Sequence, residues 1–352
     1  MEFGISFFPN VGPDEKSGQD HWGEALSLVD LCDSLGYTHV RTVEHYSHPY
    51  GGYSRNPIVF LTVASQRTKN ARLVTGAVLP AFNNPLKLAG EIAMLDAISG
   101  GRLDVGMARA FLPHKFERFG VNLDESRGRY EEGVQQVRAL LSEENVSMEG
   151  NFHTFKDVTS LPRPTQHPHP PIWVAAMQSE ESFSFAGRNG FNCMANPIGG
   201  AKMRDLLGLY QDAWKCAGHP GRGKVALAFM MYCAPTTEQA IEEAGPDVKA
   251  YFQTLADAAS DWSSGSSSKD YPGYEKMVEI LSKEDIHTQR EKSAAFVGSP
   301  EECRDMISDF YTQTGGFDIA SLQVNTKMMS VDKAQASMEL FGREVLPQFA
   351  DG

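Results

Sequence analysis

The chain has 352 residues, of which 41% are hydrophobic and 22% charged, and this composition suits a globular protein with one large α/β barrel or two ordinary domains. Its formal net charge of −13 argues against nucleic-acid binding, because phosphate backbones attract clustered lysine and arginine. We expect a cytoplasmic protein with reduced thiols and no membrane segment, since the sequence shows no long apolar run, no signal peptide and no C-x-x-C pair.

Short apolar stretches alternate with amphipathic helical patterns through the first part of the chain. Strands are predicted over residues 3–8, 38–44, 73–79 and 102–107. Helices are predicted between them, with Pro57 and Pro85 at the beginning of the second and third helices. Gly76 lies in the middle of the third strand, where a glycine usually marks a bulge or a close approach of two backbones.

The same alternation continues through the second part of the chain. A helix over 125–141, a hairpin over 147–159 and a proline-rich connector precede four more strands, predicted over 172–175, 191–195, 225–233 and 318–324. Residues 258–274 are rich in Ser, Gly and Asp, which predicts a mobile loop after the seventh strand. This loop, within a possible insertion over about 253–290, could be a lid on the site, a tolerated surface insertion or an oligomer contact.

Eight strands that alternate with helices predict parallel pairing and a single (β/α)8 TIM barrel over residues 1–352. The alternative is a doubly wound open sheet, but no glycine-rich dinucleotide turn follows the first strand. In a barrel, all strand exits lie at one end. The polar residues at these exits, namely Glu44, His45, Thr75, Arg109, Gln178 and Ser179, are therefore expected to converge.

Three of these exit residues have side chains suited to a catalytic or anion-binding site. His45 could move a proton near neutral pH, or it could be a surface histidine in a loop. Arg109 could bind an anionic phosphate with its planar guanidinium, or form a surface salt bridge. Ser179 and Ser182 at the start of a helix could bind phosphate, cap the helix, or do both.

Other motifs give weaker signals. Residues 218–225 nearly match a phosphate-binding P-loop, but Val225 replaces the required Ser or Thr, and the motif precedes a strand where it should open a helix. His167 and His169 are flanked by prolines with no third ligand nearby, so no metal site is expected there. The G-x-S-x-G elbow of hydrolases is absent from the sequence.

Three segments together resemble the bacterial luciferase-like flavin-dependent monooxygenases: residues 43–45, residues 100–106 leading to Arg109, and residues 173–175 leading to Ser179. Residues 297–302 also resemble the family's G-[ST]-P-E-E segment. The resemblance implies a TIM barrel that binds reduced FMN and reacts it with O2, through a C4a-hydroperoxyflavin, to oxygenate a small organic substrate such as an aldehyde or ketone. A separate NAD(P)H:flavin reductase and a homodimer are also implied.

The resemblance assigns roles to the exit residues. Arg109, Ser179 and Ser182 would hold the flavin phosphate, and Gln178 would also belong to the cofactor-binding site. Thr75, Gly76 and Ala77 would lie against the isoalloxazine, with Thr75–Gly76 as the candidate for a non-prolyl cis peptide bond. Glu44 and His45 would lie beside the flavin, and His45 matches the histidine associated with oxygenation.

The substrate side is less constrained by the resemblance. Phe8, Asn10, Tyr46 and Phe111 are expected to line the substrate pocket, although the aromatic residues could equally belong to the core. Ala108 and Tyr46 replace a reactive cysteine and a second histidine of luciferase, which argues against light emission and a simple aldehyde substrate. Two alternatives remain open: a deazaflavin F420-dependent oxidoreductase on the same barrel, and a flavin-binding protein without turnover.

Overall fold

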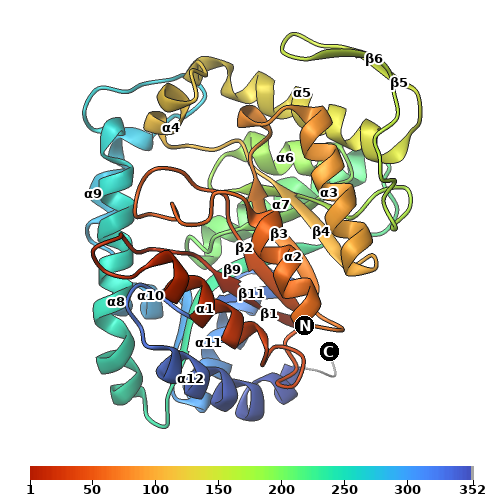
Figure 1. Ribbon diagram of the computed structural model, residues 1–352. Coiled ribbons are helices and arrows are strands. Elements are labelled where there is room, and N and C mark those ends of the chain that lie inside the picture. Colours follow the sequence, from red (N-terminus) through yellow and green to blue (C-terminus); the bar gives the residue numbers. More distant parts are fainter. Residues whose placement is uncertain (350–352) are drawn as a thin grey trace.

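The computed structural model describes residues 1–349 and contains a closed barrel of eight parallel strands (Figure 1). The strands are β1 (Glu2–Phe7), β2 (His39–Thr42), β3 (Arg72–Val78), β4 (Leu103–Met107), β7 (Ile172–Ala176), β8 (Asn192–Ala195), β9 (Val225–Cys233) and β11 (Ile319–Gln323). Neighbours along the chain pair with each other, β11 returns to β1, and β8 pairs with β9 to close the barrel. The predicted TIM barrel is therefore confirmed, and the open-sheet alternative is wrong.

The barrel interior follows from the two-residue period of its strands. Val74, Trp173, Met194 and Ile319 come from four different strands and form one buried apolar cluster. Their chain neighbours, such as Leu73 on β3, point outward and belong to the larger core between strands and helices. This alternation is expected of barrel strands, whose side chains point alternately inward and outward.

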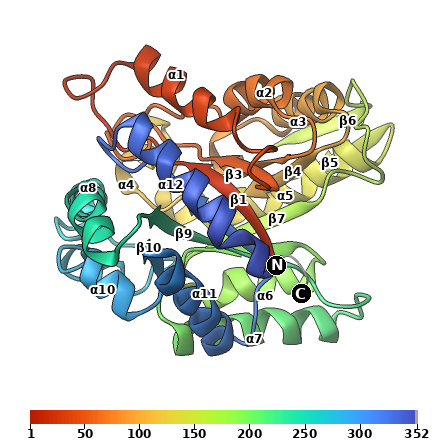
Figure 2. The same ribbon diagram turned by 90° about the horizontal axis from the view of Figure 1, so that it is seen from below.

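Helices cover the outside of the barrel (Figure 2). The longer ones are α1 (Gly18–Val29), α2 (Pro57–Arg67), α3 (Pro85–Ser99), α5 (Ser126–Ser142), α6 (Glu180–Arg188), α7 (Gly200–Cys216), α8 (Thr237–Ala258), α11 (Pro300–Thr314) and α12 (Val331–Glu344). Proline stands in the first turn of α2 and α3, as predicted, and the preceding Asn56 and Asn84 cap these helices through their side chains.

The barrel carries two further β elements. The hairpin of β5 (Val146–Glu149) and β6 (Thr154–Val158) confirms the hairpin prediction. A short strand, β10 (Ala295–Gly298), pairs with the last four residues of β9. The sequence pattern did not predict β10, because a four-residue strand gives too short a periodic signal.

The non-prolyl cis peptide bond joins Gly76 to Ala77, one residue later than the predicted Thr75–Gly76 bond. The pairing of β3 with β4 also shifts register between Thr75 and Val78. The space beside Gly76 is filled by another side chain, because an added Cβ would lie 2.0 Å from Nε of Arg41. The predicted irregularity at Gly76 is thus confirmed, while the position of the cis bond is corrected.

The segment after α8 is folded onto the protein. It contains η3 (Ser260–Trp262), η4 (Tyr274–Lys276), α9 (Met277–Leu281) and α10 (Ile286–Glu291). Trp262 and Tyr271 are buried, since aromatic side chains in this otherwise polar segment provide its apolar contacts. Residues 253–258 are the end of α8, so the insertion begins later than its predicted boundary. Its role as a lid stays a prediction.

The first and last described residues lie together at one end of the barrel. The ammonium group of Met1 donates to the carbonyl oxygen of Phe349 over 3.1 Å. Within residues 1–349, no helix combines the length and apolar character needed to cross a bilayer.

Candidate functional site

The carboxyl ends of the barrel strands contain several buried polar atoms for which residues 1–349 provide no hydrogen-bond partner. They include both amide atoms of Asn10, Nε of Arg41, Nη1 of Arg109, Nε2 of Gln323 and Oδ1 of Asn325. Buried polar groups in proteins are nearly always paired, with protein, water or ligand. These unpaired atoms therefore indicate a place where polar groups of a ligand or water bind.

His45 lies among aromatic side chains just beyond β2. Its ring meets Phe8 and Tyr50 edge to face, with centroid distances of 5.2 and 5.1 Å. The Nδ1 atom lies 2.5 Å from Nζ of Lys115. Burial lowers the pKa of His45 well below its usual value, and the positive charge of Lys115 lowers it further. His45 is thus held as a neutral imidazole, which can donate a proton from one ring nitrogen and accept one at the other.

Lys115 is the cation at this site that sequence reasoning missed. It belongs to α4 (Pro113–Arg118), a short helix after β4 that the sequence pattern did not predict. Only 2% of the residue is exposed, and burial lowers its pKa to about 7 despite the opposing effect of Glu44. Its position shortly after a predicted strand exit was the one available signal, and that signal does not distinguish it from a surface lysine.

Glu44 has three hydrogen-bond donors around its carboxylate. It accepts from the backbone N–H of Leu79 over 3.0 Å, from Nδ2 of Asn83 over 3.1 Å and from the hydroxyl of Tyr46. Burial raises the pKa of Glu44 to about 7, although these hydrogen bonds and Lys115 act in the opposite direction. Glu44 therefore ties the exit of β2 to the loop after β3, next to the His45–Lys115 pair.

Tyr46 contacts Glu44 and an aromatic group that differs from the one around His45. Its ring packs against Phe82 and Phe119, with centroid distances of 6.4 and 4.7 Å. Phe8 and Asn10, by contrast, lie in the segment just after β1, where Phe8 meets His45. Of the four predicted pocket residues, Phe8 has direct contact with His45, whereas Tyr46 is bound to Glu44.

Arg109 lies beneath the segment that follows α8. Its Nη2 atom donates to the carbonyl oxygen of Asp270 over 2.9 Å, and its guanidinium stacks on Tyr271 at 4.0 Å from the ring centroid. The same segment contacts the neighbouring loop, because Trp262 Nε1 donates to the carbonyl oxygen of Phe111 over 2.9 Å. The segment thus covers the β4 exit, while Nη1 of Arg109 remains available for another acceptor.

The β7 exit, adjacent to the β4 exit in the barrel, brings the other predicted phosphate ligands. Ser179 occupies the N-cap position of α6, but its side chain makes no capping hydrogen bond, so the capping alternative is wrong, and no residue of 1–349 forms a hydrogen bond with its hydroxyl. The N–H of Ser182 is bonded to the carbonyl oxygen of Ser179 over 2.9 Å. Gln178 points elsewhere, because its exposed side chain accepts from Nζ of Lys202 over 3.0 Å.

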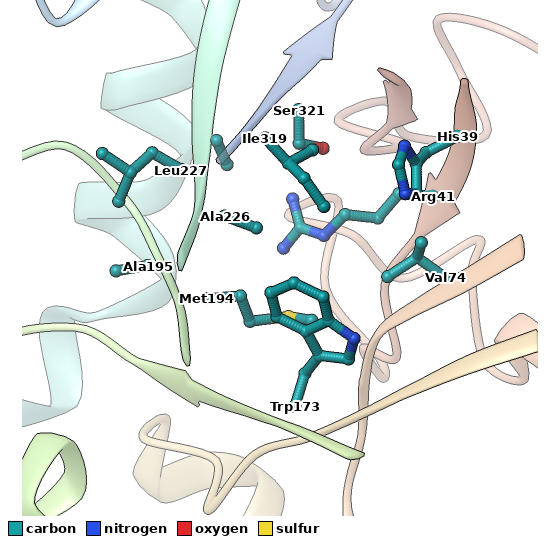
Figure 3. A pocket seen from close by; sticks show the side chains of 11 residues that line it. His39, Arg41, Val74, Trp173, Met194, Ala195, Ala226, Leu227, Ile319 and Ser321 are labelled. Carbon is teal, nitrogen blue, oxygen red and sulfur yellow. The ribbon is translucent and has the colours of Figure 1, made fainter. Parts of the chain in front are cut away.

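Arg41 extends from β2 into the barrel and lies between Ile319 and Trp173 (Figure 3). It donates to the carbonyl oxygen of Gly76 over 2.9 Å, and it borders a cavity of about 20 Å³, enough for a water molecule. Burial lowers the pKa of Arg41 to about 10, and no carboxylate of residues 1–349 forms a salt bridge with it. Sequence reasoning missed this second interior cation, although the two-residue alternation that brings His39 and Arg41 to one face of β2 could have indicated it.

Comparison with known proteins gives the chain's relatives. The family model described as luciferase-like monooxygenase matches residues 1–317. The oxygenase component of the flavin-dependent trigonelline monooxygenase of Acinetobacter baylyi is 28% identical and aligns with 100% of this chain and 96% of its own length.

Two solved structures extend the comparison. The monooxygenase RslO1 of Streptomyces bottropensis is 41% identical, with a TM-score of 0.88 over 99% of this chain and 100% of that one. The oxygenating constituent of 3,6-diketocamphane monooxygenase of Pseudomonas putida, a type II Baeyer–Villiger monooxygenase in complex with FMN, is 21% identical. It has a TM-score of 0.83 over 99% of this chain and 98% of that one, and so shares the fold.

Proposed function

Because the chain belongs to the luciferase-like monooxygenase family and is a flavin-dependent oxidoreductase, we propose that it is the oxygenase of a two-component system. A separate NAD(P)H:flavin reductase would deliver FMNH2, and the oxygenase would use O2 to insert one oxygen atom into a small organic substrate. The observation that carries this proposal is the group of unpaired polar atoms at the carboxyl ends of the strands, together with the neutral His45 just beyond β2.

The residues present fit a flavin phosphate at the exits of β4 and β7. Arg109 keeps an unpaired Nη1 atom, and the hydroxyl of Ser179 stands free at the N-terminus of the nine-residue helix α6. A guanidinium and a helix N-terminus are both favourable for a phosphate dianion. We assign the phosphate to Arg109, Ser179 and Ser182. Gln178 would lie at the edge of the cofactor site, because its side chain accepts a hydrogen bond from Lys202.

The isoalloxazine is assigned to the space between Gly76–Ala77 and His45. The pyrimidine edge of a flavin carries both donors and acceptors, and the unpaired amides of Asn10 and Gln323 can satisfy both kinds. Arg41, bonded to the carbonyl of Gly76, adds positive charge beneath this place, which favours an anionic reduced ring.

Reduced FMN, when bound, supplies the electrons and the activation of O2. His45 would donate a proton to an oxygen atom that gains negative charge during the reaction. Phe8 and Tyr50, packed edge to face on His45, would exclude water from that proton. Glu44 would keep the His45 loop in place through its bonds to Leu79 and Asn83.

The relatives support the two-component organisation and a carbonyl or nitrogen-containing substrate. The trigonelline enzyme is named as an oxygenase component, and the diketocamphane enzyme is named as a Baeyer–Villiger monooxygenase. We therefore propose a ketone, aldehyde or heteroaromatic compound as substrate. The homodimer is proposed from the resemblance alone, and light scattering on a size-exclusion column tests it.

The decisive experiment mixes the protein with FMNH2 without oxygen, adds 18O2 and a panel of ketones, aldehydes and N-heteroaromatics, and analyses products by mass. One 18O atom in a product supports the proposal. Reduction of F420 by an alcohol without oxygen uptake would refute it in favour of the deazaflavin alternative. Flavin binding without any product across the panel, and without faster oxygen uptake than free FMNH2, would favour a protein without turnover.

The His45→Gln variant tests the assigned proton donor. We expect FMNH2 affinity within about threefold of wild type and a loss of product of about a hundredfold, the usual scale of general acid–base catalysis. An equal loss of affinity and product would contradict this role.

A further inference from the structure

We propose that Lys115 is a positioning residue of the oxygenation: it holds His45 in the tautomer that presents Nε2–H to the reacting oxygen, and it donates a proton to Nδ1 as Nε2 loses its own. This inference rests on the proposed function, since it assigns a proton source to the same site.

The geometry of the contact determines the tautomer. Nζ of Lys115 lies 2.5 Å from Nδ1 of His45, across 70 residues of sequence. While Lys115 is protonated, its ammonium group has three donors and no acceptor, so Nδ1 accepts and does not carry a proton of its own. In a neutral imidazole the single N–H is then on Nε2. The Nε2 side is not engaged by Lys115 and is available to a reactant.

The short helix α4 holds Lys115 in this position from both sides. Nη1 of Arg118 donates to the carbonyl oxygen of Ser47 over 2.7 Å, which joins α4 to the loop that contains His45. The N–H of His114 donates to Asp261 over 3.1 Å, which joins α4 to the segment after α8. These contacts place Lys115 between the His45 loop and the segment after α8. The two segments cover its long side chain, which therefore remains buried.

The surroundings of Lys115 are unusual for a buried cation. Its Nζ has one hydrogen-bond partner within residues 1–349, the ring of His45, whereas buried lysines normally pair with a carboxylate. Glu44 is the nearby carboxylate, and its oxygens already accept from Leu79, Asn83 and Tyr46. A buried cation with an incomplete shell destabilises the fold, so its place against a candidate catalytic histidine indicates a functional role.

The charged and titratable groups around the pair come from four parts of the chain. Glu44 and His48 belong with His45 to the segment after β2, and His114 and Arg118 belong to α4. Asp257 lies at the end of α8 and Asp261 in η3. Burial lowers the pKa of Lys115 to about 7. The group can therefore release a proton near neutral pH, which an exposed lysine cannot do.

The proposed step transfers protons only. The Nε2–H bond of His45 breaks as an O–H bond forms on the oxygen that has gained negative charge. At the same time an N–H bond of Lys115 breaks and an Nδ1–H bond forms, so His45 stays neutral in its other tautomer and Lys115 becomes a neutral amine. The starting state is restored when water donates a proton to Nε2 and the Nδ1 proton moves back to the neutral amine of Lys115, which leaves one hydroxide ion from the water.

The test compares Lys115→Met, Lys115→Gln and Lys115→Arg with wild type, and uses Lys156→Met on the exposed face of β6 as a control. The first readout needs no activity. In protein labelled with 15N-histidine, the His45 signals, assigned by their loss in His45→Gln, should show Nε2–H in wild type and in Lys115→Arg. In Lys115→Met they should show a mixture of tautomers. An unchanged Nε2–H tautomer in Lys115→Met would overturn the proposal.

The second readout is the yield of product per O2 consumed. We expect Lys115→Met to keep FMNH2 affinity within about threefold and to lose at least about tenfold in coupled product, with partial rescue in Lys115→Arg. In wild type, coupled yield should fall as pH rises through about 7, because deprotonated Lys115 has no proton to give, and Lys115→Arg should lack this decline. A Lys115→Met enzyme with full coupling and the wild-type pH profile would overturn the proposal.

Two controls keep the outcomes separate. If Lys115→Met does not fold, Lys115→Gln against Lys115→Arg carries both readouts, because glutamine keeps a polar group and removes only the charge. If wild type gives no oxygenated product, the proposed function fails, while the 15N tautomer still decides whether Lys115 positions His45.

Discussion

The Glu44→Gln variant should gain stability relative to wild type as pH rises, because the substitution removes a buried carboxyl group that resists ionisation. Burial raises the pKa of Glu44 from 4.5 to about 7. Between these two values the folded state holds a proton that the unfolded chain has released, so the wild-type free energy of unfolding falls as pH rises. The glutamine side chain does not titrate and lacks this loss. It can still accept from Leu79 N–H, while the Tyr46 hydroxyl can turn to accept from its amide.

The size of the effect follows from the shift. A rise in the pKa of Glu44 from 4.5 to about 7, integrated between pH 5 and pH 8, corresponds to about 2.5 kcal/mol of unfolding free energy. With an unfolding entropy of about 2.1 cal/mol/K per residue, a chain of this length changes its Tm by about 3 °C for that free energy. Lys115 contributes in the same direction. Without the Glu44 charge, the pKa of the buried Lys115 falls further, so the folded variant loses this proton at lower pH than wild type does. Its stability therefore rises more between pH 5 and pH 8.

Differential scanning fluorimetry of wild type and Glu44→Gln at pH 5 and pH 8 checks this prediction, with Glu117→Gln on the exposed face of α4 as the control. The Tm of Glu44→Gln relative to wild type should rise by about 3 °C between the two pH values, and that of the control should not change. A difference that stays constant within about 1 °C would show that Glu44 ionises in the folded protein as easily as in the unfolded chain, and would refute the reasoning.

Three further predictions concern the barrel and its cover. Gly106→Ala would place a Cβ 2.1 Å from a carbonyl oxygen of β3, so we expect a loss of about 3 kcal/mol or more in urea unfolding, whereas Gly208→Ala, with open space around it, should not destabilise α7. Tyr271→Ala removes the ring stacked on Arg109, and limited proteolysis within 263–268 should become faster; unchanged cleavage would show that the ring does not anchor the segment. Arg41→Met should weaken FMNH2 binding, measured by flavin fluorescence quenching, by about tenfold, the value of one lost charged hydrogen bond, and equal affinity would remove Arg41 from the site.

Much of the fold could be predicted from local sequence. Local patterns depend only on neighbouring residues, so they can be recognised without knowledge of the tertiary structure. Examples are the two-residue alternation on strands such as β3 and the helix signals at Pro57 and Pro85. Eight such strand–helix units leave few topologies other than a closed barrel. The convergence of strand exits then follows from the closure, which is why His45 and Arg109 could be proposed as site residues.

The individual contacts of the site could not be predicted in this way. Sequence alone does not show that Arg109 lies under Asp270, that Tyr46 bonds to Glu44, or that the cis bond follows Gly76, because each depends on segments brought together by closure. The pairing of Lys115 with His45 is the clearest case, since 70 residues separate them and α4 has no strong local signal. Local patterns determine which residues reach the end of the barrel, whereas barrel closure decides which of them touch and how burial changes their charge.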